Sequence, residues 1–263
     1  MREPPLLRAL DGTVNESPYA KQDAQPLCSL DGRIDEEADV DTLHAEGTAR
    51  IKANQGAEAV AVLLLAERKA PDNPEVLANL ATALLQCRLT DEAVQRGEKA
   101  AALAPDNLDI LANLVKLQRI AGRLETAIAT CQKTIARFPD DAGIRNDLAV
   151  LYLAAGQPAR AEQEARGAVD LAPENAAFLV TLSFALVQQD RLSDAKSVAV
   201  RAVDRSPGSA DAHNQLGLVL ARLKETQEAI SEFKKALAID PAHKAAKESL
   251  ESLEDRPFEL ETP

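Results

Sequence analysis

The sequence predicts an all-α fold, a solenoid of antiparallel helix pairs closed by a short C-terminal helix. Three observations support this class. The sequence repeats with a period of 34, the separation of Pro71 from Pro105. Each period contains two blocks of apolar residues at helical spacing. The composition, finally, favours closely packed helices. Hydrophobic residues make up 46% of the chain but aromatic residues only 3%, so Ala, Leu, Val and Ile must form the interior.

The period is visible in four series of residues. Prolines occur at positions 71, 105, 139, 173, 207 and 241. An alanine series has the same spacing: Ala59, Ala93, Ala127, Ala161, Ala195 and Ala229. Two further series hold mostly small residues, namely Ala66, Ala100, Thr134, Ala168, Ala202 and Ala236, and Gly47, Ala81, Val115, Ala149, Ser183 and Gly217. Small side chains at fixed intervals are expected where helices cross closely.

Each period is predicted to be a helical hairpin. Between Leu77 and Ala104, for example, the apolar spacing of a helix is interrupted around Cys87–Asp91 and then resumes. The interruptions carry residues that tolerate the left-handed conformation at a helix end, namely Asn54, Gly122, Gly156 and Asp190. Asn107 and Asn175, which follow the repeated prolines, are suited to cap the next helix.

The charge and the cysteines limit the class of protein. The formal net charge of -12 disfavours nucleic-acid binding, because an acidic chain repels phosphates. Cys28, Cys87 and Cys131 lack metal-ligand or redox spacing, which favours a reducing compartment. The most apolar run, Val60–Ala66, is too short to span a bilayer, and the N-terminus lacks a signal-peptide pattern. We therefore predict a cytoplasmic protein without membrane insertion, unless a leader has been removed.

No catalytic, metal or cofactor site is predicted. His44, His213 and His243 are far apart in the sequence, and neither a glycine-rich phosphate loop nor a nucleophile elbow is present. Acidic pairs lie beside turns and prolines, where helix capping accounts for them. The sequence thus predicts a protein that is not an enzyme and uses no cofactor.

The pattern of small residue, alanine, small residue and proline at places 8, 20, 27 and 32 of each period resembles the tetratricopeptide repeat family. Places are counted from the first residue of each predicted repeat. The resemblance covers residues 40–243 and implies a right-handed superhelix. It divides the chain into repeats at 40–73, 74–107, 108–141, 142–175, 176–209 and 210–243.

The segments outside the repeats receive separate predictions. Residues 244–254 form a capping helix with one apolar face, which linear repeat arrays need at their ends. Residues 1–39 are acidic and lack periodicity, so we expect a mobile segment, or alternatively a short helix that docks on the first repeat. Residues 255–263 form an acidic tail that includes Phe258 and Leu260.

The resemblance implies a partner-binding surface on the first helix of each repeat, at places 2, 5, 6, 9, 12 and 13. These places hold an amide-rich polar zone, an apolar zone and a basic pair. The polar zone is Asn79, Asn113, Asn146, Asp147, Thr181, Asn214 and Gln215. The apolar zone is Val150, Leu153, Val180, Phe184, Val187 and Leu218, and the basic pair is Lys116 and Arg119. Side-chain amides can pair with the backbone of an extended peptide, and an exposed apolar patch suits a partner's apolar residues.

The sequence therefore predicts a scaffold or adaptor that binds a peptide segment or helix of another protein in a concave groove. Each predicted site residue also has a purely structural interpretation, as interhelical core or as a solvated helix face. The alternative function is self-assembly into homo-oligomers through the repeat ends or the acidic tail. Binding of chaperone C-termini is disfavoured, because the Lys and Asn that this requires are replaced by His44 and Thr48 and by Ala78 and Thr82.

Overall fold

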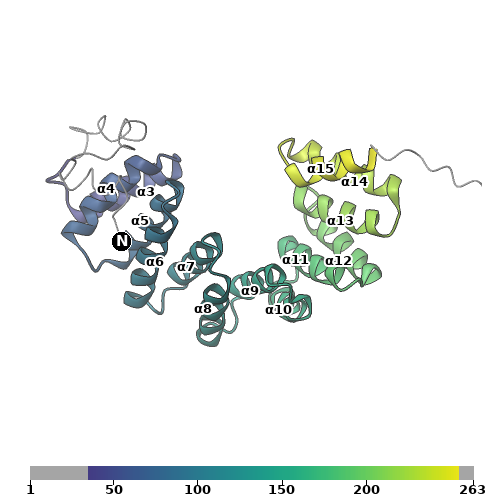
Figure 1. The fold of residues 1–263 in the computed structure, drawn as a ribbon, viewed down its shortest axis with the longest axis horizontal. Coiled ribbons are helices and arrows are strands. Elements are labelled where there is room, and N and C mark those ends of the chain that lie inside the picture. Colours follow the sequence, from purple (N-terminus) through teal and green to yellow (C-terminus); the bar gives the residue numbers. More distant parts are fainter. Residues whose placement is uncertain (1–34, 255–263) are drawn as a thin grey trace, which may run out of the picture. The chain divides into compact units, whose positions relative to one another are not determined.

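A computed structural model describes residues 35–254, and every regular element in that range is a helix (Figure 1). The helices are α3 (Val40–Lys52), α4 (Gly56–Lys69), α5 (Pro74–Gln86), α6 (Thr90–Leu103), α7 (Leu108–Ile120), α8 (Leu124–Arg137), α9 (Ala142–Ala154), α10 (Pro158–Leu171), α11 (Ala176–Gln188), α12 (Leu192–Arg205), α13 (Ala210–Arg222), α14 (Thr226–Ile239) and α15 (Lys244–Glu254). The predicted all-α class is confirmed. Most of the predicted N-terminal segment, the tail residues Phe258 and Leu260, and Cys28 lie outside the described residues.

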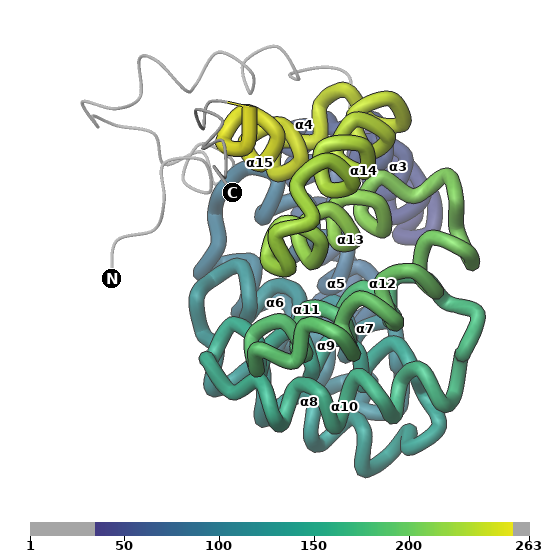
Figure 2. Tube along the Cα trace, turned by 90° about the vertical axis from the view of Figure 1, so that its right-hand side faces the viewer, coloured from purple at the N-terminus to yellow at the C-terminus, as the bar shows by residue number. Residues whose placement is uncertain are grey.

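Two compact units divide the chain between Thr130 and Cys131, inside α8. We call residues 1–130 unit 1 and residues 131–263 unit 2. Within each unit, successive helices pack as antiparallel pairs joined by short turns. The first helices of neighbouring pairs also contact one another, α3 with α5 and α5 with α7 in unit 1, and α9 with α11, α11 with α13 and α13 with α15 in unit 2 (Figures 1 and 2).

The first helix of each pair begins at a side chain that accepts a backbone N–H. Asn107 Oδ1 accepts from Ile110 N at 3.2 Å, and Asn175 Oδ1 accepts from Ala177 N at 3.0 Å, as predicted. The same contact is made by Asp39, Asn73, Asp141 and Ser209. At α15 the acceptor is His243 Nδ1, 3.1 Å from Ala246 N. These contacts satisfy backbone donors that have no partner within the helix.

The turn inside each pair contains one residue with positive φ. Asn54, Gly122, Gly156 and Asp190 adopt this conformation, as predicted. Arg88 and Lys224 do so too, with φ of 60° and 64°. The turn geometry therefore recurs in every pair, even where the side chain is unfavourable for it.

Glycine at place 8 permits close helix crossing in two of the pairs. A Cβ added to Gly47 would lie 2.5 Å from Leu63 Cγ, and one added to Gly217 would lie 2.7 Å from Phe233 Cε1. Leu63 and Phe233 are both fully buried. The large side chain on the second helix thus occupies the space that a side chain on the first helix would need.

Buried apolar residues form separate clusters within each unit. The cluster in unit 2 surrounds Phe233 and extends over Leu179, Leu186 and Val219 to Ala246 of α15. In unit 1 a cluster surrounds Leu80, Leu84 and Leu117, which are fully buried. Among the described helices, none combines the length and the apolar character needed to cross a membrane.

Candidate functional site

The predicted partner-binding residues all lie on the first helices of their pairs, on α5, α7, α9, α11 and α13. We call the places 2, 5, 6, 9, 12 and 13 of these helices, together with those of α3 and α15, the first-helix face of each unit. Because first helices contact one another within a unit, the first-helix face of each unit is a continuous row.

In unit 1 the amides of the first-helix face are bonded to the neighbouring helix. Asn79 Nδ2 lies 2.6 Å from His44 Nε2 and donates to Thr48 Oγ1 at 2.8 Å. Asn113 Nδ2 donates to Thr82 Oγ1 at 3.2 Å and to the Ala78 carbonyl at 3.3 Å. The amide N–H groups that were predicted to meet a ligand therefore hold successive first helices together.

The basic pair of unit 1 is exposed. Lys116 and Arg119 both lie on α7 with their side chains in solvent. Neither is bonded to a carboxylate among the described residues. Both cations are available to an acidic group of a partner.

In unit 2 the polar members of the first-helix face are less accessible. Asn214 and Gln215 are buried, with 9% and 3% of their surface exposed. Gln215 Nε2 donates to Ser183 Oγ at 3.1 Å. The Oδ1 atoms of Asn146 and Asn214 are buried and accept no hydrogen bond in the described part of the chain. Asp147 is half-buried.

The apolar members in unit 2 lie in three environments. Phe184 is 39% exposed, and it is the one aromatic residue among the exposed large apolar side chains of the described chain. Val180 and Leu218 are half-buried against the core, as Val150 and Leu153 are half-buried on α9. Val187 is buried and belongs to the core cluster. The accessible apolar surface therefore comes from the members other than Val187.

Leu218 lines a hollow of about 300 Å³ between α13, α14 and α15. Its other lining residues are Ala221, Phe233, Glu248, Ser249, Ser252 and Leu253. The three polar residues of α15 were not predicted as site residues. Their positions could have indicated them, because Glu248, Ser249 and Ser252 follow Asn214, Gln215 and Leu218 by one sequence period each.

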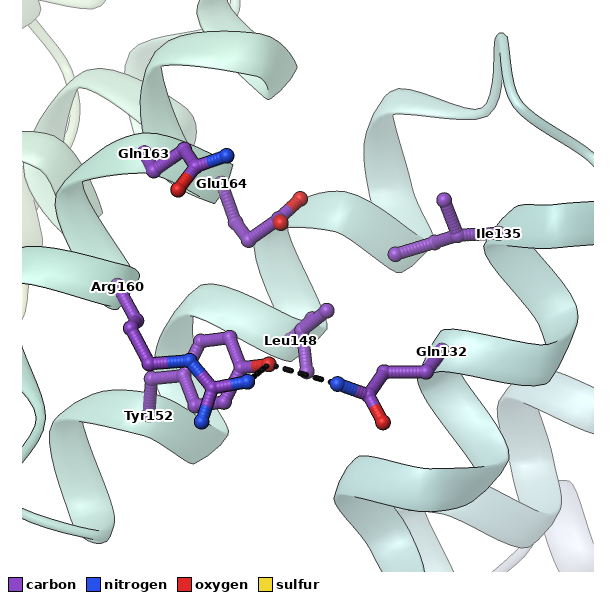
Figure 3. Close-up of a pocket in the computed structure, with 7 residues that line it drawn as sticks. All are labelled: Gln132, Ile135, Leu148, Tyr152, Arg160, Gln163 and Glu164. Carbon is purple, nitrogen blue, oxygen red and sulfur yellow. Dashed lines mark hydrogen bonds between the residues drawn. The ribbon is translucent and has the colours of Figure 1, made fainter.

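A second hollow, of about 260 Å³, lies between the C-terminal half of α8, α9 and α10 (Figure 3). It is lined by Gln132, Ile135, Leu148, Tyr152, Arg160, Gln163 and Glu164. Arg160 stacks on the Tyr152 ring, with Cζ 4.1 Å from the ring centroid. No spacing pattern in the sequence joins Tyr152 to Gln132 or Arg160.

Two observations describe the Cys131 thiol and the groups that could hold a metal ion. Burial, with a contribution from the Asp147 carboxylate, raises the pKa of the Cys131 thiol to about 12, so the thiol stays protonated at neutral pH. Among residues 35–254, no group of three His, Cys, Asp or Glu side chains is arranged to hold a metal ion.

Family models of the tetratricopeptide repeat match residues 89–142, 118–168 and 183–244, which together make up more than half of the chain. The chain belongs to the tetratricopeptide repeat family. The predicted resemblance to this family is therefore confirmed. A comparison with curated protein sequences found no match.

Solved structures of other tetratricopeptide repeat proteins share the fold. A chain of the APC/C hetero-tetramer Cut9–Hcn1 has a TM-score of 0.67 at 19% identity over 94% of this chain, which spans 48% of that one. PilF of Pseudomonas aeruginosa has a TM-score of 0.64 at 15% identity, with 81% of this chain and 97% of that one covered. YrrB, described as having an unusual peptide-binding site, has a TM-score of 0.51 at 18% identity, with 72% and 97% covered. At these identities the similarity shows the fold alone.

Proposed function

We propose that this tetratricopeptide repeat protein binds a segment of a partner protein along the first-helix face of unit 2, with apolar side chains of the segment contacting Phe184. The tetratricopeptide repeat fold is that of a protein-interaction scaffold. A solenoid also forms its extended concave surface along one set of helices, which is where a peptide or helix docks in the proposed groove. The proposal is for binding alone, with no reaction of the partner.

The observation that carries this proposal is the exposure of Phe184 on a surface made by first helices. An aromatic side chain that is 39% exposed leaves apolar area in water, and such a side chain is a suitable anchor for a partner. Val150 and Leu218 occupy the same place as Phe184 on the adjacent first helices and are half-buried. The hollow beside Leu218 extends the apolar surface towards α15.

The first-helix face of unit 1 is a separate surface with exposed charge, and its amides are hydrogen-bonded between neighbouring first helices. Asn79 and Asn113 are engaged with His44, Thr48 and Thr82, so they offer a ligand only their remaining hydrogen-bonding capacity. Lys116 and Arg119 remain exposed and suit a segment that carries acidic residues. Salt should therefore weaken binding at unit 1 more than at unit 2.

Site-specific photo-crosslinking tests the proposal. A photoreactive phenylalanine analogue at position 184 should crosslink to a partner protein in a lysate of the source cells. The same analogue at Val200 is the matched control, because Val200 is also 39% exposed but lies on the second helix α12. Equal crosslinking to the same proteins at both positions would exclude the first-helix face as a specific site.

A substitution pair gives the quantitative test. Phe184→Ser should reduce capture of the crosslinked partner at least about tenfold, as expected for loss of an aromatic anchor. Val200→Ser should leave capture unchanged. Retention of the partner by Phe184→Ser at full affinity, with the fold intact by circular dichroism, would contradict the proposal.

Self-assembly remains the second candidate function. Its predicted contacts are the repeat ends and the tail, and the tail lies outside the described residues. Truncation after Asp255 should lower the mass measured by light scattering if the tail mediates assembly. An unchanged mass at several concentrations would exclude that role.

A further inference from the structure

We propose that the hollow between α8, α9 and α10 is a second binding site, specific for a carboxylate group, and that Arg160 and Tyr152 recognise that carboxylate. The site is lined mainly by second helices and belongs entirely to unit 2. It is separate from the first-helix face, so the proposal stands independently of the function proposed above.

Arg160 is an exposed cation at the edge of the hollow, and no carboxylate of the described residues is its partner. Its Nη1 donates to Gln157 Oε1 at 2.8 Å and its Nη2 donates to the Tyr152 hydroxyl at 2.6 Å. Both acceptors are neutral, and no ion pair of Arg160 exists among the described residues. A guanidinium group carries five N–H donors, so three remain for a ligand. Stacking on Tyr152 holds the guanidinium plane in one orientation.

The other acid of the hollow does not neutralise Arg160. Glu164 lies one helical turn after Arg160 on α10, the usual spacing for an ion pair. Its carboxylate is instead paired with Arg145, with Nη1 and Oε2 3.3 Å apart. In Figure 3 the Glu164 carboxylate and the Arg160 guanidinium lie apart on the wall of the hollow. The positive charge of Arg160 therefore remains available.

The Tyr152 hydroxyl offers a second donor. Tyr152 is 2% exposed, and its oxygen accepts from Gln132 Nε2 at 3.0 Å and from Arg160 Nη2 at 2.6 Å (Figure 3). A phenol oxygen has two lone pairs, and these two donors occupy both. With the Gln132 amide oriented in this way, the O–H of Tyr152 has no acceptor in the described chain. This O–H can therefore donate to an oxygen of a ligand in the hollow.

These donors fit a carboxylate. The Arg160 N–H groups and the Tyr152 O–H both require acceptor oxygens, and the net positive charge of Arg160 favours a single negative charge. A dianion is disfavoured by Glu164 and by the net charge of -12. The carboxylate belongs either to an acidic side chain or to the C-terminus of a peptide, and the probes below distinguish these two sources.

Three five-residue peptides serve as probes in titrations followed by two-dimensional ¹H–¹⁵N NMR of the full chain. The first has a central glutamate between glycines with both ends blocked, the second has glutamine in its place, and the third is all glycine with a free C-terminal carboxylate. We expect saturable shifts of the Arg160 Nε–H resonance and of the Gln163 amide with the first or the third peptide. The glutamine peptide should bind about tenfold more weakly or worse, because it lacks the charge.

Variants assign the recognition to the two side chains. Arg160→Gln should weaken binding about tenfold or more, and Tyr152→Phe, which keeps the ring, about threefold. Arg166→Gln is the matched control, since it removes the same charge from α10 outside the hollow. That control should bind like the unaltered chain. Tyr152→Phe also keeps the proposal testable if Arg160→Gln unfolds.

Two outcomes would overturn the proposal. One is the absence of shifts at Arg160 and Gln163 with both carboxylate peptides. The other is a glutamine peptide that binds as tightly as the glutamate peptide. Carboxylate-dependent shifts that Tyr152→Phe and Arg160→Gln both weaken, and that Arg166→Gln does not, would establish the site.

Discussion

Place 9 of the first helices holds the polar residues Thr48, Thr82 and Lys116 in unit 1, but the apolar residues Val150, Phe184 and Leu218 on α9, α11 and α13 of unit 2. In unit 1 each threonine hydroxyl accepts a hydrogen bond from the amide at place 6 of the next first helix. On α9, α11 and α13 of unit 2 no hydroxyl is present at that place. Gln215 bonds to Ser183 at place 8 instead, and Phe184 remains exposed. The threonines at this repeat position thus join neighbouring first helices in unit 1, whereas Phe184 at the same position offers apolar surface in unit 2.

The largest expected effect concerns the helix crossings that both units build from glycine and a large residue. Phe233→Ala should lower the free energy of unfolding by about 3 to 5 kcal/mol, and Leu63→Ala in unit 1 by about 2 to 5 kcal/mol. Both side chains are fully buried opposite a glycine. Urea unfolding followed by circular dichroism measures the change.

A double-mutant cycle checks the reason for this effect. Gly217→Ala should cost about 1 to 3 kcal/mol by itself, because its Cβ would lie 2.7 Å from the Phe233 ring. Combined with Phe233→Ala, the same alanine should cost nothing or restore stability. Additive losses would show that the two residues do not compete for space.

The half-buried carboxyl of Glu232 makes the stability of unit 2 depend on pH. Burial opposes ionisation of Glu232, but hydrogen bonds from Lys235 and His213 outweigh it and lower the pKa of this carboxyl from 4.5. The stabilisation is therefore present above about pH 4.5 and is lost as the pH falls through the lower pKa of the folded state. Glu232→Gln should cost about 1.5 to 3 kcal/mol at pH 7 and flatten the loss of stability in acid.

Glu67→Gln in unit 1 is the control for that experiment. Glu67 forms one ion pair with Arg96, at 3.2 Å, and we expect a cost below about 1 kcal/mol at pH 7. Thermal unfolding at several pH values compares the two variants. Equal costs would mean that the hydrogen bonds of Glu232 add no stability.

The amides at places 5 and 6 should respond with opposite signs in the two units. Asn79→Ala should cost about 1 kcal/mol, because it removes the bond from α5 to Thr48 of α3. Asn214→Leu should be neutral or stabilise by up to about 1 kcal/mol, because it replaces a buried oxygen that has no hydrogen-bond donor. Destabilisation by Asn214→Leu matching that of Asn79→Ala would remove the proposed difference between the units.

The smallest expected effect concerns the turns, which are alike in both units. Arg88→Gly and Lys224→Gly should each raise stability by up to about 1 kcal/mol, since a non-glycine residue with positive φ is strained. Gly156→Ala should lower stability by a similar amount for the same reason. Shifts in the midpoint of urea unfolding are the readout, and a loss on Arg88→Gly would indicate a role for its side chain.

The sequence by itself determined the fold class, the family and several of the helix caps and turns. The constant repeat period places the same turn, cap and crossing in every pair, and each of these features depends mainly on nearby residues. Asn107 caps α7 and Gly156 adopts positive φ for local reasons, so both could be predicted. The sequence also placed the predicted site residues on first helices, because their places follow from the helical period.

The tertiary structure decided what those residues contact. Asn79 pairs with Thr48 at a separation of 31 residues, and Tyr152 meets both Gln132 and Arg160 in a hollow formed by three helices. The helical period fixes which side of a helix a residue occupies, but not the rotamer it adopts or the chemistry of the residue opposite. Both depend on side chains from neighbouring helices. Tertiary packing therefore decides that the Asn79 amide bonds to the adjacent helix while the Phe184 side chain stays exposed.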